Sequence, residues 1–205
     1  MKTPHPSLMQ YGIFSRPKKG RDVSGDAYVI LEENKQVLLG VIDGLGSGEA
    51  AAGASRTAAR CIEENSTRPL PEIMTKCHLA LHDTRGVVMA LMRIDFETQE
   101  VSFVGVGNVS FHALSKEPIK PISKSGIVGY RLPHLKEFKY PYTPGDLFVL
   151  HTDGVSHRFL LNPSKEESGW HSDFKVEGRD VQELAEEIAS RFGKENDDIT
   201  ILVAR

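Results

Sequence analysis

The chain has 205 residues, of which 40% are hydrophobic and 26% charged, and its formal net charge is −3. These values are typical of a globular protein with a substantial core, so we expect a single domain over residues 1–205. The negative charge and the lack of a basic block argue against a nucleic-acid partner. No apolar run is long enough for a membrane span or a signal peptide. Cys61 and Cys77 lack metal-type spacing, which favours a reducing compartment and a cytoplasmic location.

The first half of the chain predicts strands interrupted by two helices. Branched and aromatic residues predict strands at 11–14, 27–31 and 36–42. An alanine-rich segment predicts a helix over 49–64, and a second helix is expected from Pro71 to a stop near Gly86. The runs 87–94 and 100–106 are joined by a short polar connection, which is typical of a hairpin.

The second half predicts fewer regular elements. Strands are expected at 109–114, 146–151 and 199–203, and a helix over 179–192. Residues 118–144 are irregular, and 157–178 predict a polar surface loop or flap. Short strands with hairpin turns and a few amphipathic helices indicate an α+β fold, in which helices cover antiparallel sheets.

Aspartates lie at the ends of strand-like runs that are far apart in the sequence: Asp26, Asp43, Asp153 and Asp197. Asp43 and Asp153 are each followed by glycine, which lets the glycine carbonyl turn towards an ion bound by the aspartate. Any one Asp-Gly is also a common turn. Carboxylates that converge are stable mainly when hard divalent cations neutralise them. Two such ions about 3.5–4 Å apart can activate a shared water and hold a phosphoryl oxygen, so the pattern predicts a metal-dependent enzyme.

These aspartates lie within longer motifs: VSGDAY (23–28), VIDGLGSG (41–48), PGD (144–146), TDGV (152–155) and NDDIT (196–200). In this order the set resembles the metal-dependent protein phosphatases of the PPM (PP2C-like) family, and within it the bacterial SpoIIE branch. The short domain is similar to members of that branch that act on the stressosome. The resemblance covers nearly the whole chain and implies a β-sandwich of two antiparallel sheets flanked by α-helices, in αββα order.

The resemblance also implies a metal site. Two manganese or magnesium ions are expected, held by the side chains and one carbonyl of Asp26, Asp43, Gly44, Asp153 and Asp197. In that arrangement Asp43 bridges the ions, Asp153 and Asp197 complete the shell of the first ion, and Asp26 holds the second. The expected role of Asp198 is to support the ligands without binding metal itself.

Several positions depart from the family pattern. Gly25 stands where most relatives carry glutamate, and Leu45 where many carry the histidine assigned as proton donor. Asn108 stands where relatives often have an aspartate linked to a third metal, so we expect no third ion. His151 and His157 flank the second Asp-Gly. Alternation along a strand favours His151 facing away from the site, and a role for His157 in proton transfer stays open.

The family's phosphate-binding arginine near the N-terminus has no clear match. Arg16 and Arg21, with Lys18 and Lys19, are candidates in a suitable loop. A solvated basic loop without a binding role is the alternative interpretation.

The expected function follows from the resemblance. The protein would hydrolyse phosphoserine or phosphothreonine by direct attack of metal-activated water, without a phosphoenzyme. Its partners would be phosphorylated STAS-domain proteins of the stressosome or anti-sigma antagonists, and it would act as a monomeric negative feedback regulator of the general stress response. One alternative is a catalytically weak module that binds the same phosphoproteins. Another is a metal-dependent hydrolase of small phosphate esters.

Overall fold

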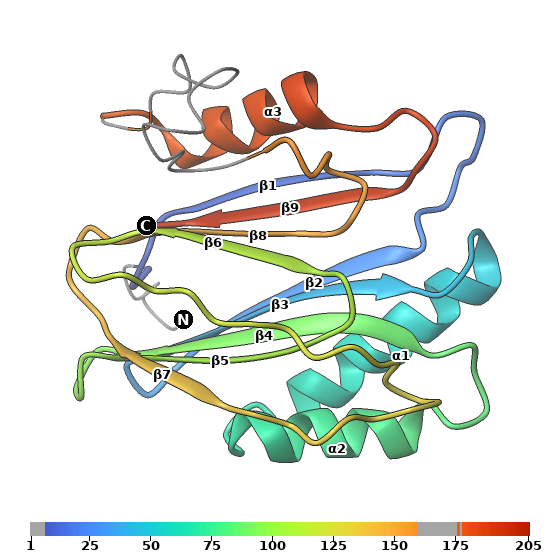
Figure 1. The fold of residues 1–205 in the computed structure, drawn as a ribbon, viewed down its shortest axis with the longest axis horizontal. Helices are drawn as coiled ribbons and strands as arrows, with labels where there is room; N and C mark the ends of the chain where they lie inside the picture. Colours follow the sequence, from blue (N-terminus) through green and yellow to red (C-terminus); the bar gives the residue numbers. More distant parts are fainter. Residues whose placement is uncertain (1–6, 160–175, 177) are drawn as a thin grey trace, which may run out of the picture.

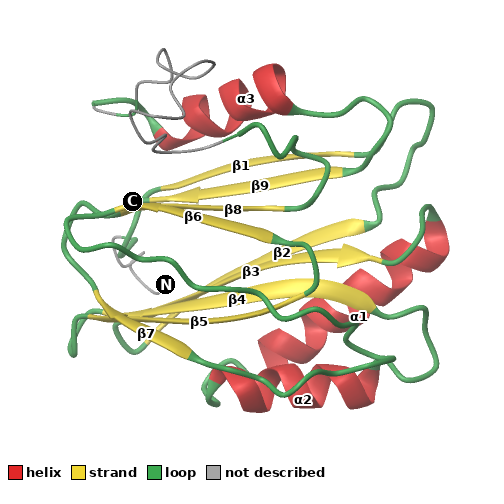
Figure 2. Ribbon diagram, in the orientation of Figure 1, coloured by secondary structure: helices red, strands yellow, loops and turns green. Residues whose placement is uncertain are grey.

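Nine strands pair into two antiparallel sheets in a computed structural model that describes residues 7–159, 176 and 178–205 (Figures 1 and 2). The first sheet has the order β1 (Tyr11–Arg16), β9 (Ile199–Ala204), β8 (Leu147–His151) and β6 (Ser110–Leu114). The second sheet has the order β2 (Asp26–Glu33), β3 (Gln36–Gly44), β4 (Val87–Asp95), β5 (Glu100–Val106) and β7 (Phe138–Pro141).

Helices cover the outer face of each sheet. The helix α3 (Val181–Phe192) packs on the first sheet, and α1 (Glu49–Glu64) and α2 (Leu70–Ala80) pack on the second (Figure 1). One apolar cluster lies beneath α1 and α2 and another beneath α3, and a third, the inter-sheet cluster, fills the space between the sheets. The layers therefore follow the expected αββα order. No helix in the described ranges has the length and apolar character needed to cross a membrane.

Alternation along the strands decides which side chains enter the space between the sheets. In β3, Val37, Leu39 and Val41 belong to the inter-sheet cluster, whereas Leu38 and Ile42 pack against the helices. A run that is buried on both faces reads as continuously apolar, which is why residues 36–42 show no polar alternation. The next inward position after Val41 is Asp43, so the apolar face ends in a carboxylate.

The β2–β3 hairpin fixes the position of Asp43 relative to β2. Its two turn residues, Asn34 and Lys35, have φ of 51° and 59°, as a two-residue type I′ turn requires. From this turn the register runs without interruption from Glu33 opposite Gln36 to Asp26 opposite Asp43.

The structure differs from the sequence-based expectations in two places. The segment expected to be irregular contains β7, which pairs with β5 at the sheet edge. The helix α2 ends at Ala80, and the expected stop, Gly86, instead has φ of 80° in the turn into β4. Most of the expected loop over 157–178 lies outside the described residues.

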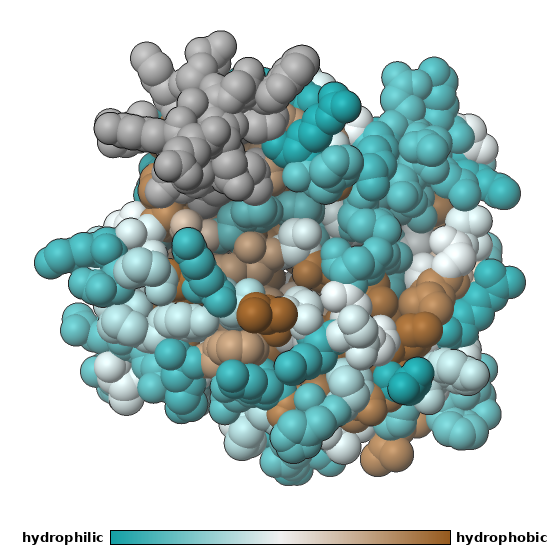
Figure 3. All heavy atoms as spheres, in the orientation of Figure 1, coloured by the Kyte–Doolittle hydropathy of each residue, from teal (hydrophilic) through white to brown (hydrophobic). Residues whose placement is uncertain are grey.

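On the face in Figure 3, hydrophilic residues prevail and hydrophobic ones appear in small groups.

Candidate metal-dependent active site

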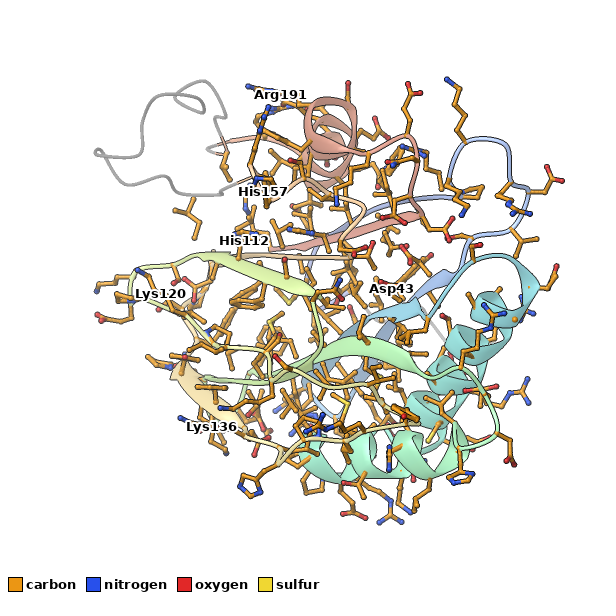
Figure 4. The ribbon with its side chains drawn as sticks, turned by 45° about the vertical axis from the view of Figure 1, so that its right-hand side comes forward. Asp43, His112, Lys120, Lys136, His157 and Arg191 are labelled. Atoms are coloured by element: carbon orange, nitrogen blue, oxygen red, sulfur yellow. The ribbon has the colours of Figure 1, made fainter. Side chains whose placement is uncertain are left out.

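The hairpin brings two of the expected ligands together. Asp26 and Asp43 are directly opposite each other at the open end of β2 and β3. Ile30 of β2 packs into the inter-sheet cluster, so alternation points Asp26 to that side as well. Figure 4 shows Asp43 between the two sheets. Like charges directly across two strands are destabilising, so this pair needs a compensating positive charge when both are ionised.

A threonine of the first sheet holds Asp26. Thr152, directly after β8, donates a hydrogen bond from Oγ1 to Asp26 Oδ2 over 2.7 Å. The same Oγ1 accepts a hydrogen bond from the backbone N–H of Thr200 at 3.0 Å. Thr152 is fully buried. Its hydroxyl therefore ties the TDG motif on one sheet to the first aspartate on the other.

Asp153 is held by two residues from distant parts of the chain. Asn108 donates a hydrogen bond from Nδ2 to Asp153 Oδ2 over 2.7 Å, and the Lys194 ammonium donates to the Asp153 carbonyl oxygen. The other carboxylate oxygen, Oδ1, accepts no hydrogen bond from the described residues. The backbone here is tightly packed, because a Cβ on Gly154 would lie 1.9 Å from the Asp198 carbonyl oxygen.

Asp198 fastens the β1–β2 loop to the site. Its Oδ1 accepts from the backbone N–H of Lys18 and its Oδ2 from that of Gly25, both at 2.8 Å. The residue is buried and both oxygens accept hydrogen bonds, whereas its role beside a metal stays a prediction. Its own N–H donates to Asp197 Oδ1 at 3.1 Å.

The electrostatics show that the carboxylates lie close together. Burial raises the pKa of Asp43 to about 8, and the rise is reinforced by the charges of Asp26, Asp153, Asp197 and Asp198. No described residue donates a hydrogen bond to the Asp43 carboxylate. It is therefore an inward-facing acid whose ionised form has negative neighbours and no donor.

Two further acids share this environment. Burial raises the pKa of Asp26 to about 7; the hydrogen bond from Thr152 opposes the rise, and nearby carboxylates add to it. The pKa of Asp197 is also raised, first by burial and then by the charge of Asp153, and Lys194 opposes the rise. The folded protein therefore disfavours the ionised form at three strand-end aspartates.

This donor set fits a hard divalent cation in its chemistry. Carboxylate and carbonyl oxygens are the ligands that magnesium and manganese prefer, and a cation would relieve the repulsion at Asp43. Within the described part of the chain, no three acidic, histidine or cysteine side chains form a ready-made ligand set. The strand ends bring the carboxylates near one another without arranging three of them as ligands.

The basic candidates have different surroundings. The Arg16 guanidinium is occupied: it donates to the carbonyl oxygens of Lys194 at 2.8 Å and Pro17 at 3.0 Å. Lys19 forms an exposed ion pair with Glu195 at 2.8 Å. Arg21 is exposed, and its guanidinium makes no hydrogen bond or ion pair with the described residues, although its backbone N–H donates to the Lys18 carbonyl oxygen at 3.1 Å.

The residues next to the two Asp-Gly tips also have clear positions. Leu45 packs against the inter-sheet cluster and has no proton to donate in place of the family histidine. His151 follows Val149 on the α3 side of β8 and is buried against His112 and Phe159, so it faces away from the inter-sheet space, as alternation predicts. Reading the sequence missed the roles of Thr152 and Lys194. Only the place of Thr152 beside an Asp-Gly tip could have marked it.

Comparisons with known proteins agree with this geometry. The family model described as "Stage II sporulation protein E (SpoIIE)" matches residues 33–205. The chain is 25% identical over 195 residues to phosphoserine phosphatase RsbX of Bacillus subtilis (strain 168). This match covers 94% of the chain and 92% of RsbX.

Solved structures support the same fold. A structure from work on the bacterial stressosome superposes with a TM-score of 0.84 at 31% identity, covering 96% of this chain and 99% of that chain. A crystal structure of RsbX in complex with magnesium superposes with a TM-score of 0.79 at 25% identity, covering 96% and 94%. The similarity supports a serine phosphatase and confirms the expected αββα sandwich.

Proposed function

Because the chain belongs to the SpoIIE family of PP2C-like phosphatases, we propose that it is a metal-dependent phosphatase of phosphoserine and phosphothreonine in proteins. The observation that carries the proposal is the acidic cluster, by which we mean Asp43 and the carboxylates around it: Asp26, Asp153, Asp197 and Asp198. Burial and four neighbouring carboxylates raise the pKa of this acid, and no described donor compensates its charge. A purely structural end of a β-sandwich has no need for such an arrangement.

The residues that would hold two manganese or magnesium ions are Asp26, Asp43, Asp153 and Asp197, with the carbonyl of Gly44. Bound ions of this kind lower the pKa of a water and stabilise negative charge on phosphoryl oxygens.

The surrounding residues would fix these ligands in place. Thr152 orients Asp26 through its hydroxyl, and Asn108 occupies one oxygen of Asp153 and leaves the other for an ion. Lys194 holds the Asp153 carbonyl. Such supporting hydrogen bonds orient ligands and tune metal affinity.

Arg21 is the best placed of the basic candidates to bind the substrate phosphate. It lies in the loop that Asp198 fastens to the site through Lys18 and Gly25, and it is exposed. The Arg16 guanidinium donates to two backbone carbonyls, so it supports the loop instead. Since Leu45 cannot protonate the leaving serine oxygen, that proton would come from solvent or from another group.

The proposed substrates are phosphorylated STAS-domain proteins of the stressosome or anti-sigma antagonists. Support comes from the similarity to a protein named phosphoserine phosphatase RsbX and to a structure from stressosome work. We further propose that the protein works in the cytoplasm as one monomeric domain over residues 1–205, and that it acts as a negative feedback regulator of the stress response.

A second candidate is a catalytically weak module that binds the same phosphoproteins. Leu45 and Gly25 favour it, because they replace a proton donor and an acidic ligand of the family. The acidic cluster opposes it, because binding alone does not require carboxylates that raise one another's pKa.

A manganese titration separates these functions. The wild type and Asp43→Asn would be assayed on a serine-phosphorylated STAS-domain protein and on para-nitrophenyl phosphate. A phosphatase releases phosphate from the phosphoprotein only with metal and only with Asp43. Binding without turnover would support the module, and turnover confined to the small ester would support a hydrolase of small phosphate esters.

A further inference from the structure

A hollow of about 280 Å³ lies beside the acidic cluster and shares Asp153 with it. Its other lining residues include Asn108, Ser110, His112, His157 and Lys194. This volume is close to the lower end of the range of ligand sites, about 300 Å³. A smaller one, of about 20 Å³, lies around Gln36 and Arg93 at the opposite end of β3 and shares no residue with the cluster.

The hollow lies on the α3 side of the first sheet. In β6, Phe111 and Ala113 pack into the inter-sheet cluster, so Ser110 and His112 face the other way. Figure 4 shows His112 and His157 on that side and Asp43 between the sheets. Asp153, just beyond the end of β8, is the point where the hollow and the acidic cluster meet.

Two histidines give the hollow a defined polarity. His151 Nδ1 lies 2.8 Å from the Thr152 carbonyl oxygen, which can only accept, so Nδ1 carries the proton. His151 Nε2 then accepts from His112 Nε2, 3.2 Å away. His112 Nδ1 is left as an acceptor, and no described residue donates to it.

Hydrogen-bond donors also line the hollow. Ser110 makes no side-chain hydrogen bond with the described residues, and His157 is exposed with a ring that can donate. An acceptor at His112 together with these donors suits an extended polypeptide, which presents both N–H and C=O groups along its length.

We propose that this hollow binds the stretch of the substrate protein next to its phosphoserine. The inference rests on the proposed phosphatase function. Because Asp153 belongs to both sites, one molecule can place its phosphoryl group at the acidic cluster and its neighbouring residues in the hollow. A small phosphate ester reaches only the acidic cluster, so the hollow selects phosphoproteins over small esters.

Filling the hollow tests this selection. Ser110→Trp adds bulk to its wall, and Lys116→Trp, at an exposed position just beyond β6, is the matched control. With manganese, Ser110→Trp should lower kcat/KM about tenfold on a serine-phosphorylated STAS-domain protein, mainly through KM. Activity on para-nitrophenyl phosphate should stay within about twofold of wild type. Equal loss on both substrates, or on neither, would overturn the inference.

A binding experiment separates this inference from the proposed function. In an Asp43→Asn background, calorimetric titration with the same phosphoprotein measures affinity without turnover. Ser110→Trp should raise the dissociation constant about tenfold, and the milder His157→Ala, which removes one donor without adding bulk, about threefold. Unchanged affinity in both variants would refute the hollow as a binding site, even if the wild type is an active phosphatase. Weakened affinity with an inactive wild type would support the hollow and refute the phosphatase.

Discussion

Replacing Asp43 by asparagine should stabilise the metal-free protein at alkaline pH. Asparagine keeps the shape of the side chain but removes a charge that sits among other carboxylates and receives no hydrogen bond from the described residues. Most substitutions of inward-facing polar residues destabilise a fold, so a gain in stability would be a specific signature of stored repulsion.

The sign follows from the two protonation states. The Asp43 carboxyl has a pKa of 3.8 in the unfolded chain and about 8 in the folded chain. Between these values the folded protein keeps a proton that the unfolded chain has released, so the free energy of unfolding falls as the pH rises from about 4 to about 8. A difference of one pKa unit corresponds to about 1.36 kcal/mol. The Asp43 carboxyl therefore lowers the free energy of unfolding at pH 8 by at most about 5 kcal/mol.

Water and counter-ions drawn to the ionised site screen part of this repulsion. We therefore expect Asp43→Asn to raise the free energy of unfolding at pH 8 by about 2 kcal/mol. This corresponds to a rise of about 4–8 °C in melting temperature for a chain of this size, and at pH 4.5 the two proteins should differ little. Urea and thermal unfolding in EDTA at several pH values measure the difference. Asp83→Asn, at an exposed surface position, is the control. Equal destabilisation by Asp43→Asn at both pH values would refute the reasoning.

Three further predictions concern the metal and the histidines. Manganese at about 100 times its dissociation constant should raise the free energy of unfolding by about 2.7 kcal/mol, and Asp153→Asn should remove most of this gain. If manganese stabilises the Asp153→Asn variant as much as the wild type, Asp153 is not a ligand. Asn108→Leu should weaken manganese binding about tenfold by calorimetry, because Asp153 loses its donor, while the metal-free melting temperature changes little. Burial is the largest cause of a lowered pKa at two histidines. It brings the pKa of His112 to about 3 and that of His151 to about 4, against 6.5 in the unfolded chain. The unfolded chain therefore binds more protons below pH 6.5, and stability falls as the pH falls. His112→Phe should reduce this slope by about one proton, or about 1.4 kcal/mol per pH unit, in urea titrations between pH 4 and 6, and an unchanged slope would count against the assignment.

Much of the fold follows from local sequence patterns. The strand β3 alternates between two apolar faces, and counting from Val41 places Asp43 between the sheets without any structure. The helix α1 occupies the residues predicted from its alanine-rich segment. The predicted gathering of strand-end aspartates agrees with the charges that raise the pKa of Asp43, whereas their roles as ligands stay predictions.

Other features depend on contacts that no local pattern records. The strand β7 has a single partner, lies at a sheet edge and ends in Pro141, so the sequence gives it little strand character. The hydrogen bonds of Asn108 and Lys194 to Asp153 span 45 and 41 positions in the chain. The carbonyl contacts of the Arg16 guanidinium likewise depend on how the loops after β1 and α3 meet.

The tight turn at Asn34 and Lys35 lies at the far end of the hairpin from Asp26 and Asp43, yet it sets the alignment of these two aspartates. Inserting a single residue there would shift one strand by a step and turn its aspartate towards the helices. An insertion on the distant surface would thus separate the two carboxylates while every acidic residue is still present in the sequence. Surveys of inactive relatives should therefore compare the lengths of this connection as well as the identity of the acidic positions.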